Sequence, residues 1–337
     1  MGNTKLGSQS FCPDSPPVIV GYGCAAGGKE AEGPLGAQFD HISQDDTFGE
    51  SSWEKAESRM QDLALKAALG RAGLASDGLD LLLAGDLLNQ CIGSSFAART
   101  AAVPYLGLYG ACSTMGESLA LASLLLGAGY GRHAAAVTSS HFCSAERQYR
   151  TPLEYGCQRT PTAQWTATAA GAVVLGREGH GPRVTCVTIG IVRDKGIQDA
   201  NNMGAAMAPA AYDTLRAHFA DTGRSPDYYD LIITGDLGYL GHRIVTDFFA
   251  RDGVRMDHYD DCGLILFDRE RQDVHCGASG CGCSASVLTS HLLPGMEKGL
   301  WRRILFCPTG ALLSPTSTMQ GESIPGICHA VALEGGS

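Results

Sequence analysis

The sequence predicts an α/β protein built from two similar halves, and three observations support this fold class. The chain has 337 residues, of which 44% are hydrophobic and 18% are charged, which is typical of an ordered globular protein with a large core. Short apolar runs that end at turn residues alternate with helical patterns, which favours sheets covered by helices. A segment of the first half also recurs in the second half.

The repeat joins a strand pattern to a turn in both copies. Residues 80–88 match residues 230–238 at an offset of 150 positions. The identical pairs are Asp80/Asp230, Leu81/Leu231, Gly85/Gly235, Asp86/Asp236 and Leu87/Leu237. A repeat of half the chain length predicts two α/β halves, which we place at residues 18–195 and 196–337, after an N-terminal arm at 1–17. Chance similarity of one short segment is the alternative.

The chain begins with an arm, a strand and a loop. Residues 1–17 are polar and contain three prolines, so we expect a loose arm. The apolar run 18–21 predicts a short strand. Residues 24–50 are rich in glycine and aspartate, which predicts a long surface loop.

A long helix and a buried strand follow the loop. Ser51 and Glu54 have the spacing of a capping box, and the apolar spacing after them predicts a helix to about Arg71. Gly73 is expected to end this helix. The apolar residues 81–84 predict a buried, parallel-type strand.

Cys112 lies at a predicted sharp turn between a strand and a helix. An apolar, turn-rich run at 103–108 precedes it, and a small-residue helical segment at 116–126 follows it. The free N–H groups and the positive dipole end of a helix favour a thiolate, so we expect a reactive sulfur here. The alternative is a small buried residue that packs a tight turn.

The remaining elements complete both halves. Residues 138–150 are dense in hydrogen-bonding groups and are a candidate ligand-facing loop, with a solvated loop at a dimer edge as the alternative. A second cysteine-containing turn at 280–284 precedes another helical run. Further elements are predicted as a helix at 203–219 and strands at 134–137, 166–175, 183–192, 304–307 and 327–333.

Charge and cysteine content limit the partners and the compartment. The formal net charge is −10, so nucleic acid and anionic lipid are poor partners for the surface as a whole. The 13 cysteines are scattered and odd in number, and we identify no secretory leader, so we expect reduced thiols in the cytoplasm. No apolar run reaches the roughly 18 residues of a spanning helix.

Six segments carry a family resemblance that covers nearly the whole chain. They are residues 30–36, 84–90, 107–115, 137–150, 161–165 and 280–284. On these segments the chain resembles the stage V sporulation protein AD family of spore-forming bacteria. The resemblance implies a thiolase-like fold, with two repeated α/β halves that form a five-layered αβαβα core like that of the ketoacyl synthases.

The resemblance also implies a function and partners. Its members are expected to bind dipicolinic acid (pyridine-2,6-dicarboxylate), free or as the calcium chelate, within the uptake and release machinery of the spore. The implied partners are the membrane subunits of a channel complex and a second copy of the chain. The implied location is the cytoplasm, peripherally at the forespore inner membrane through those subunits. We expect no cofactor.

Condensing chemistry requires groups that this chain lacks at the corresponding positions. A thiolate attacks the acyl thioester, and two histidine or asparagine side chains then bind the developing negative charge. Cys112 matches the nucleophile. The second-half positions hold Asp236 and Cys283 instead, and His242, His258 and His275 are more simply surface or satisfied histidines. We therefore expect a non-catalytic pocket.

Candidate ligand residues surround the predicted pocket of the first half. A planar aromatic dianion requires cations, N–H donors and an apolar slot. The candidates are Asp86, Cys112, Ser139, His141, Arg147, Arg150, Arg159, Gln164 and Cys283. Asp86 would hold calcium in a chelate, and the helix after Cys112 would offer N–H groups to a carboxylate. Each arginine has an exposed surface charge as its alternative.

Two other functions stay open at this point. One is an acyltransferase of the condensing type with Cys112 as nucleophile. The other is a metal module on Cys276, Cys281 and Cys283, whose spacing lacks the paired C-x-x-C of structural zinc sites, so we assign no metal.

Overall fold

One 13-stranded sheet contains two five-stranded parts with the same strand order, which meet at the pairing of Val18 with Arg183 and are called the first and second sheets below. The structure is a computed structural model and describes residues 2–150, 154, 156 and 158–336. The first sheet has the order β3-β9-β7-β5-β6 and the second has the order β10-β17-β14-β11-β12. Counted along the chain, both orders are 1-5-4-2-3, with the same parallel and antiparallel neighbours. The duplication predicted from the short repeat is therefore confirmed by topology.

The strands of each sheet come from one continuous part of the chain. The first sheet contains β3 (Val18–Gly27), β5 (Leu81–Gly85), β6 (Tyr105–Gly107), β7 (His133–Ser140) and β9 (Ala169–Gly176). The second contains β10 (Arg183–Thr188), β11 (Leu231–Thr234), β12 (Tyr259–Asp261), β14 (Arg303–Cys307) and β17 (Ala330–Glu334). Strand β10, which lies before the predicted boundary at residue 195, is the first strand of the second sheet.

The repeated aspartates explain why the halves share this arrangement. Asp80 Oδ2 accepts the N–H groups of Arg132 at 2.6 Å and His133 at 3.0 Å. Asp230 Oδ2 accepts those of Arg302 at 2.7 Å and Arg303 at 2.8 Å. Each aspartate therefore holds the start of one strand against the start of its parallel neighbour.

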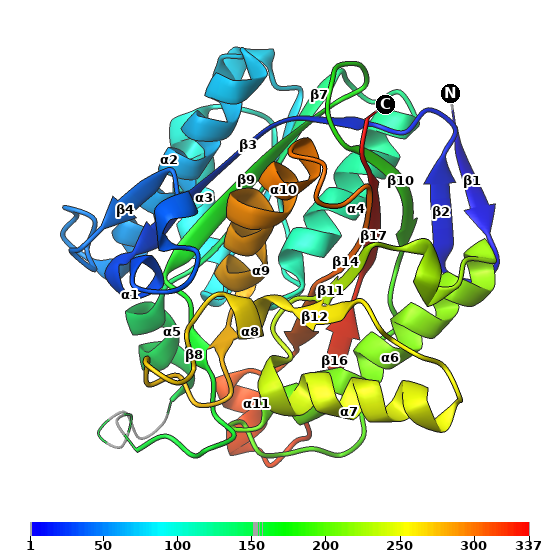
Figure 1. Ribbon diagram of the computed structural model, residues 1–337. Helices are drawn as coiled ribbons and strands as arrows, with labels where there is room; N and C mark the ends of the chain where they lie inside the picture. Colours follow the sequence, from blue (N-terminus) through cyan, green and yellow to red (C-terminus); the bar gives the residue numbers. More distant parts are fainter. Residues whose placement is uncertain (1, 151–153, 155, 157, 337) are drawn as a thin grey trace.

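Helices form three layers around the two sheets (Figure 1). The central layer contains α4 (Thr114–Gly127) and α9 (Cys281–Val287), the latter continuing through a π-helical turn (Leu288–Leu292) into α10 (Leu293–Glu297). The outer layers contain α2 (Trp53–Ala72) and α3 (Ile92–Ala101) on the first sheet, and α6 (Met203–Thr222) and α7 (Gly238–Arg251) on the second. These are the five αβαβα layers that were expected.

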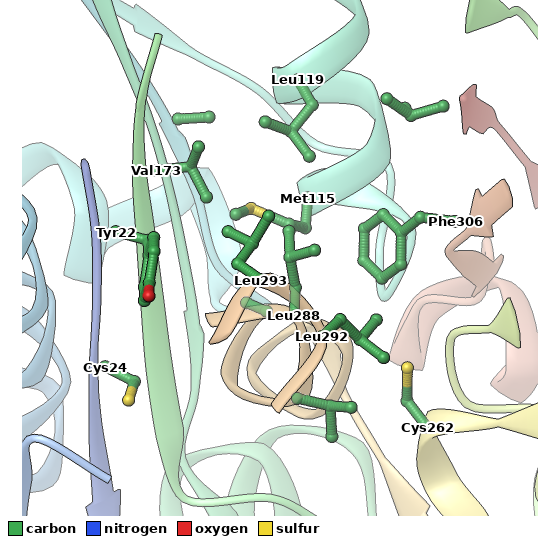
Figure 2. Packing of buried hydrophobic residues seen from close by; sticks show 14 of the residues in the cluster. Tyr22, Cys24, Met115, Leu119, Val173, Cys262, Leu288, Leu292, Leu293 and Phe306 are labelled. Atoms are coloured by element: carbon green, nitrogen blue, oxygen red, sulfur yellow. The ribbon is translucent and has the colours of Figure 1, made fainter. Parts of the chain in front are cut away.

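The main core fills the space between the sheets. Figure 2 shows Met115 and Leu119 of α4 facing Leu288, Leu292 and Leu293, with Phe306 of β14 beside them. These side chains are all buried. Close packing requires glycine at two positions. A Cβ on Gly171 or Gly282 would lie within 2.5 Å of a backbone carbonyl oxygen across the layer.

Shorter elements connect the layers. The helices are α1 (Gly28–Ala31), α5 (Phe142–Tyr149), α8 (Cys262–Ile265) and α11 (Pro315–Met319). The strands are β1 (Asn3–Leu6), β2 (Ser10–Pro13), β4 (His41–Ser43), β8 (Trp165–Thr166), β13 (Ala278–Ser279), β15 (Thr309–Ala311) and β16 (Gly326–Cys328). The predicted helix at 51–71 is confirmed, with Ser52 as its N-cap and Gly73 in a left-handed C-cap.

Two predicted loops are wrong. The polar segment 138–150 contains the end of β7 and the helix α5, whose N-terminus is capped by the His141 side chain. The segment 24–50 contains the end of β3 together with α1 and β4, and its Glu30 is fully buried. Hydrogen-bonding side chains that indicated a surface loop are used here to satisfy backbone N–H groups.

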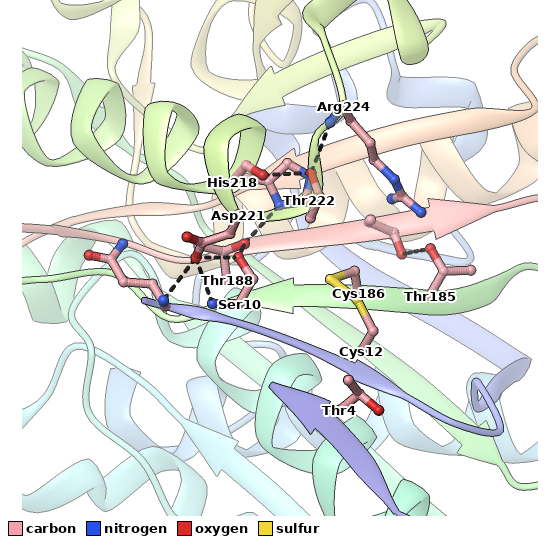
Figure 3. The surroundings of a disulfide bond; sticks show 12 residues. Thr4, Ser10, Cys12, Thr185, Cys186, Thr188, His218, Asp221, Thr222 and Arg224 are labelled. Atoms are coloured by element: carbon pink, nitrogen blue, oxygen red, sulfur yellow. Dashed lines mark hydrogen bonds between the residues drawn. A yellow bond between two sulfur atoms is a disulfide. The ribbon is translucent and has the colours of Figure 1, made fainter. Parts of the chain in front are cut away.

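The N-terminal arm is not loose, and one cysteine pair is oxidised. Strand β2 pairs with β1 and β10, and Asp221 accepts the N–H groups of Gln9 at 2.8 Å and Ser10 at 3.0 Å. A disulfide joins Cys12 to Cys186 (Figure 3). The expectation of reduced thiols throughout is therefore wrong for this pair. Within the part of the chain that the structure describes, no helix is both long and apolar enough to cross a membrane.

Candidate ligand-binding site

The turn that carries Cys112 has the predicted form. It connects β6 to α4, and Ala111 before the cysteine has the left-handed φ of 50° that non-glycine residues rarely adopt. The N–H of Ser113 bonds to the carbonyl of Gly110 at 3.1 Å and that of Thr114 bonds to Ala111 at 3.3 Å. These two N–H groups are therefore used inside the turn and do not serve a ligand carboxylate.

Cys112 lies at the wall of a cavity of about 530 Å³ between the two halves. Tyr149 packs against the cysteine side chain, together with Leu87 and Ala145 of the first half and Cys281 of the second. Met319 and the exposed Asp199 also line the cavity, from the side of the second half. The volume is within the usual range of small-molecule sites.

Asp236 faces Cys112 from the loop after β11. Its carboxylate accepts the Thr309 hydroxyl at 2.9 Å, the Gly280 N–H at 2.9 Å and a hydrogen bond from the Cys112 thiol. Burial raises the pKa of Asp236 to about 7, against the lowering effect of these three hydrogen bonds. A titrating acid therefore stands beside the sulfur.

The expected thiolate at Cys112 is wrong. Burial raises the pKa of Cys112 well above its ordinary value, and the adjacent Asp236 carboxyl raises it further, whereas the Gly280 N–H lowers it. Desolvation disfavours the charged form, and a neighbouring anion disfavours it again. These effects outweigh the helix dipole, so the sulfur is held as a thiol.

Of the two second-half residues expected where condensing enzymes require electrophilic partners, Asp236 lies beside Cys112 and Cys283 does not. No histidine is among the cavity-lining residues that the structure describes. His242 stacks on Tyr259 with ring centroids 4.4 Å apart, and His275 contacts the carbonyl of Thr160 at 2.6 Å. Cys283 is fully buried in the main core and does not line the cavity, so its assignment as a ligand residue is wrong.

The structure brings three predicted site residues to the cavity: Cys112, Arg150 and Gln164. Arg150 forms an ion pair with Glu146 and donates to Asn201 Oδ1 at 3.2 Å. Gln164 donates to the backbone carbonyls of Asp236 and Ala278, both at 2.7 Å. Gln164 therefore fixes the backbone that carries Asp236.

Three predicted polar residues lie in the protein interior instead. Asp86 accepts the N–H groups of Leu88 and Ser94, and the Ser94 hydroxyl at 2.6 Å, so its oxygens are satisfied. Ser139 donates to Glu57 at 3.0 Å, and the Nε2 of His141 contacts the Asp46 carbonyl at 2.6 Å. Burial raises the pKa values of both Asp86 and Glu57. The assignment of Asp86 as a calcium ligand is therefore wrong.

Two predicted arginines do not reach the cavity. Arg147 is exposed, pairs with Glu54 and lies over the ring of Trp53. Arg159 is buried, pairs with Asp273 at 2.7 Å and lies over Trp165 with its guanidinium carbon 4.6 Å from the ring centroid. Both belong to ion pairs outside the cavity, and the alternative of an exposed surface charge fits Arg147 but not Arg159.

The sequence interpretation missed several residues that line the cavity. They include Tyr109, Glu146, Tyr149, Asp199 and Asn201. The first three lie within the segments that carry the family resemblance, so their position there was a usable signal. Asp199 and Asn201 arrive from a loop of the second half, and nothing local in the sequence marks them.

The cysteines proposed as a metal module do not converge. Cys276, Cys281 and Cys283 direct their sulfurs to three different carbonyl oxygens, those of Pro161, Ser139 and Gly235. Among the described residues, no group of three or more histidine, cysteine or acidic side chains is placed to hold a metal ion.

Comparison with known proteins assigns the family. The family model described as Stage V sporulation protein AD matches residues 7–334. A curated relative, the stage V sporulation protein AD of Bacillus subtilis (strain 168), is 45% identical over 329 residues, which cover 97% of each chain. The chain belongs to the stage V sporulation protein AD family.

Solved structures confirm the thiolase-like fold of this family member. A variant of OleA from Xanthomonas campestris matches with a TM-score of 0.60 over 98% of this chain and 100% of its own, at 14% identity. The 3-oxoacyl-(acyl carrier protein) synthase III of Pseudomonas aeruginosa matches with a TM-score of 0.55 over 95% and 98%, at 15% identity. At these identities the likeness shows the fold alone.

Proposed function

We propose that this member of the stage V sporulation protein AD family acts in sporulation as a non-catalytic binder of dipicolinic acid. The ligand would occupy the cavity beside Cys112, between the two halves. The observation that carries the proposal is the Cys112–Asp236 pair, because it places a carboxyl group where condensation requires a hydrogen-bond donor.

The pair opposes condensation for an electrostatic reason. Condensation develops negative charge on a thioester oxygen near the sulfur, and the enzyme must supply donors to that oxygen. An ionised Asp236 would repel this charge, and because its pKa is about 7 the carboxyl carries the proton needed for donation in only about half of the molecules at neutral pH. Each lost donor typically costs about 3–4 kcal/mol in the barrier.

The cavity fits a polar aromatic ligand better as a neutral chelate than as a dianion. Among the described lining residues, Arg150 is the one cation, and Glu146 already pairs with it. Glu146 and Asp199 add negative charge, whereas Gln158, Gln164 and Asn201 offer amide groups. A calcium ion carried by the ligand would neutralise the ligand's carboxylates and would be coordinated by carboxylate oxygens of Glu146 and Asp199.

Titration calorimetry tests the proposal with dipicolinate alone and with equimolar calcium. We expect heat of binding in the presence of calcium and weaker binding without it. Arg150→Gln should weaken binding about tenfold or more, because a charge-assisted hydrogen bond contributes roughly 1.5–3 kcal/mol. The matched control is Arg147→Gln, one turn earlier in α5 and outside the cavity, which should bind as the wild type does.

The absence of heat in both forms at millimolar ligand would sink the binding proposal. The alternative, an acyltransferase, is favoured by one feature, the position of Cys112 at a cavity wall before a helix N-terminus. Incubation with acyl-CoA and peptide mass spectrometry would reveal it as an acyl adduct on Cys112 that Cys112→Ala abolishes.

We propose two kinds of partner on different grounds. Association with membrane subunits of a sporulation channel complex, at the forespore inner membrane, rests on the family resemblance alone. Pairing of two copies is supported by the edge strand β6, whose Leu106 is 42% exposed.

A further inference from the structure

A second cavity adjoins the first. It has a volume of about 410 Å³ and lies between the segment that follows β5 and the segment between β15 and α11. Tyr109, Tyr149, Leu313 and Pro315 line both cavities. These shared residues therefore form the partition between an inner cavity, which contains Cys112, and this outer cavity.

One half of the partition is fixed. The Tyr149 hydroxyl donates to the Leu87 carbonyl at 2.5 Å, and its ring packs against Cys112 and Ala145. Leu87 also accepts the Gln148 side chain at 3.0 Å. The hydroxyl and the ring of Tyr149 are therefore both held in place.

The other half of the partition, Tyr109, is held by one side-chain hydrogen bond. The hydroxyls of Tyr109 and Tyr149 are 2.9 Å apart. Because the Tyr149 proton goes to Leu87, Tyr109 is the donor in this pair. The Tyr109 side chain is 45% exposed, and exchanging one neutral hydrogen bond for a bond to water costs only about 1 kcal/mol.

The two cavities differ in charge. The described residues of the outer cavity include no ionisable acid or base apart from the two tyrosines. Leu88, Leu312 and Leu313 give it an apolar lining, with Asn89, Gln90 and Ser314 at its rim. The inner cavity contains Arg150, Glu146 and Asp199. An uncharged group is therefore favoured in the outer cavity and a charged one in the inner.

The wall of the outer cavity is held in a strained conformation. Gln90 and Cys91 are consecutive non-glycine residues with left-handed φ values of 58° and 50°. Such residues persist only where surrounding contacts determine them, and they concentrate at ligand sites. Here the contacts are the Cys91 sulfur on the Leu108 carbonyl at 3.3 Å and the Leu88–Cys91 turn.

We propose that the outer cavity is a second binding site for an uncharged aliphatic or aromatic group, and that Tyr109 is a movable partition that joins it to the cavity of Cys112. A ligand with a polar head and an apolar extension would then occupy both cavities when Tyr109 swings aside. This proposal is independent of dipicolinate binding.

Thiol labelling measures whether an alkyl group on Cys112 reaches the outer cavity. An alkyl methanethiosulfonate transfers its S-alkyl group to the thiol, forming a mixed disulfide and releasing methanesulfinic acid. The rates with hexyl and methyl reagents are compared by peptide mass spectrometry at Cys112. Their ratio cancels the pKa of the thiol, since both reagents attack the same sulfur.

The expected ratios differ in direction between variants. Tyr109→Ala, which removes the partition, should raise the hexyl-to-methyl ratio about tenfold, the effect of burying about two more methylene groups. Tyr109→Phe should raise it less. Gln90→Trp, which fills only the outer cavity, should lower it about tenfold. Gln44→Trp lines neither cavity and should leave it unchanged.

Hexyl-to-methyl ratios within about twofold of the wild type in both Tyr109→Ala and Gln90→Trp would overturn the proposal. The proposal requires a change of about tenfold in each variant, in opposite directions. In that outcome the hexyl group would leave through the mouth of the inner cavity. The methyl rate in each variant shows whether the site around Cys112 is intact.

Discussion

At the scale of single residues, the pairing of Cys112 with Asp236 decides the chemistry of the site. The Cys112 thiol and the Asp236 carboxyl are both buried, and burial makes both groups resist ionisation. Whichever group ionises first raises the cost for the other. Because Asp236 is fully buried and Cys112 alone of the pair lines the cavity, the wall there is polar and uncharged at acidic pH.

This pair predicts a specific pH dependence of stability. The pKa of Asp236 is about 7 in the folded chain against an ordinary 3.8, so the folded state keeps a proton that the unfolded state releases. The stabilisation is fully present below about pH 4 and is lost as the pH rises through about 7. Relative to Asp236→Asn, the wild-type free energy of unfolding should fall across this window, by at most about 4 kcal/mol.

Urea unfolding at a series of pH values between about 4 and 8 measures this difference. Asp199→Asn is the control, because Asp199 is exposed at the cavity mouth and should follow the wild-type profile. Parallel profiles for the wild type and Asp236→Asn would contradict the assignment of the proton to Asp236.

The sequence indicated part of the site at this scale, for a physical reason. Cys112 was found because a strand, a turn and a helix form a local pattern that periodicity reveals. Asp86 and Arg147 were misplaced because their hydrogen-bond and ion-pair partners, Ser94 and Glu54, are set by tertiary packing. The absence of a histidine beside Cys112 could be predicted because the repeat locates the position in the sequence, and that position holds Asp236.

At the scale of elements, β6 is an edge strand whose outer side has no hydrogen-bonded neighbour strand among the described residues. Leu106 in β6 is 42% exposed and Phe96 in α3 is 41% exposed. Edge strands with exposed apolar side chains are ready to pair with another strand. A second copy of the chain could pair there by an isologous contact.

Light scattering tests this pairing. We expect a mass of twice the 35.3 kDa of one chain at micromolar concentration. Leu106→Lys should shift the equilibrium to monomers, because charged residues on an edge oppose pairing. Leu300→Lys, at a side chain 64% exposed elsewhere, should leave the mass unchanged. A monomeric wild type at these concentrations would refute the pairing.

Helix α5 shows why a loop was wrongly predicted at 138–150. Serine, histidine and arginine side chains in 138–150 indicated a ligand-facing loop. In the structure His141 accepts the Cys143 N–H at 3.2 Å as an N-cap, and Arg150 pairs with Glu146 one turn away. The same hydrogen-bonding groups therefore stabilise a helix, and its last turn still delivers Tyr149 and Arg150 to the cavity.

At the scale of the whole molecule, the disulfide ties the N-terminal hairpin to the second sheet. Cys12 lies in β2 and Cys186 in β10, 174 positions apart in sequence. Pairing between distant cysteines cannot be read from their spacing, because 13 cysteines allow many connectivities. The fold class and the duplication were readable, since both depend on repeated local patterns.

The disulfide predicts a measurable gain in stability. Closing so long a loop removes entropy from the unfolded chain, so Cys12→Ser should lower the free energy of unfolding by up to about 4–5 kcal/mol. Cys143→Ser, at a free and half-buried thiol, is the control. Thiol titration of the denatured, unreduced chain should find two fewer thiols than the 13 cysteines of the sequence. A full count would disprove the bond.

The paired aspartates have a consequence for substitutions at the site. Asp80 and Asp230 act at the start of β5 and β11, whereas Asp86 and Asp236 follow the opposite ends of the same strands. A substitution at position 236 therefore leaves the anchor at the other end of β11 in place, so the groups beside Cys112 can change while the strand order is kept.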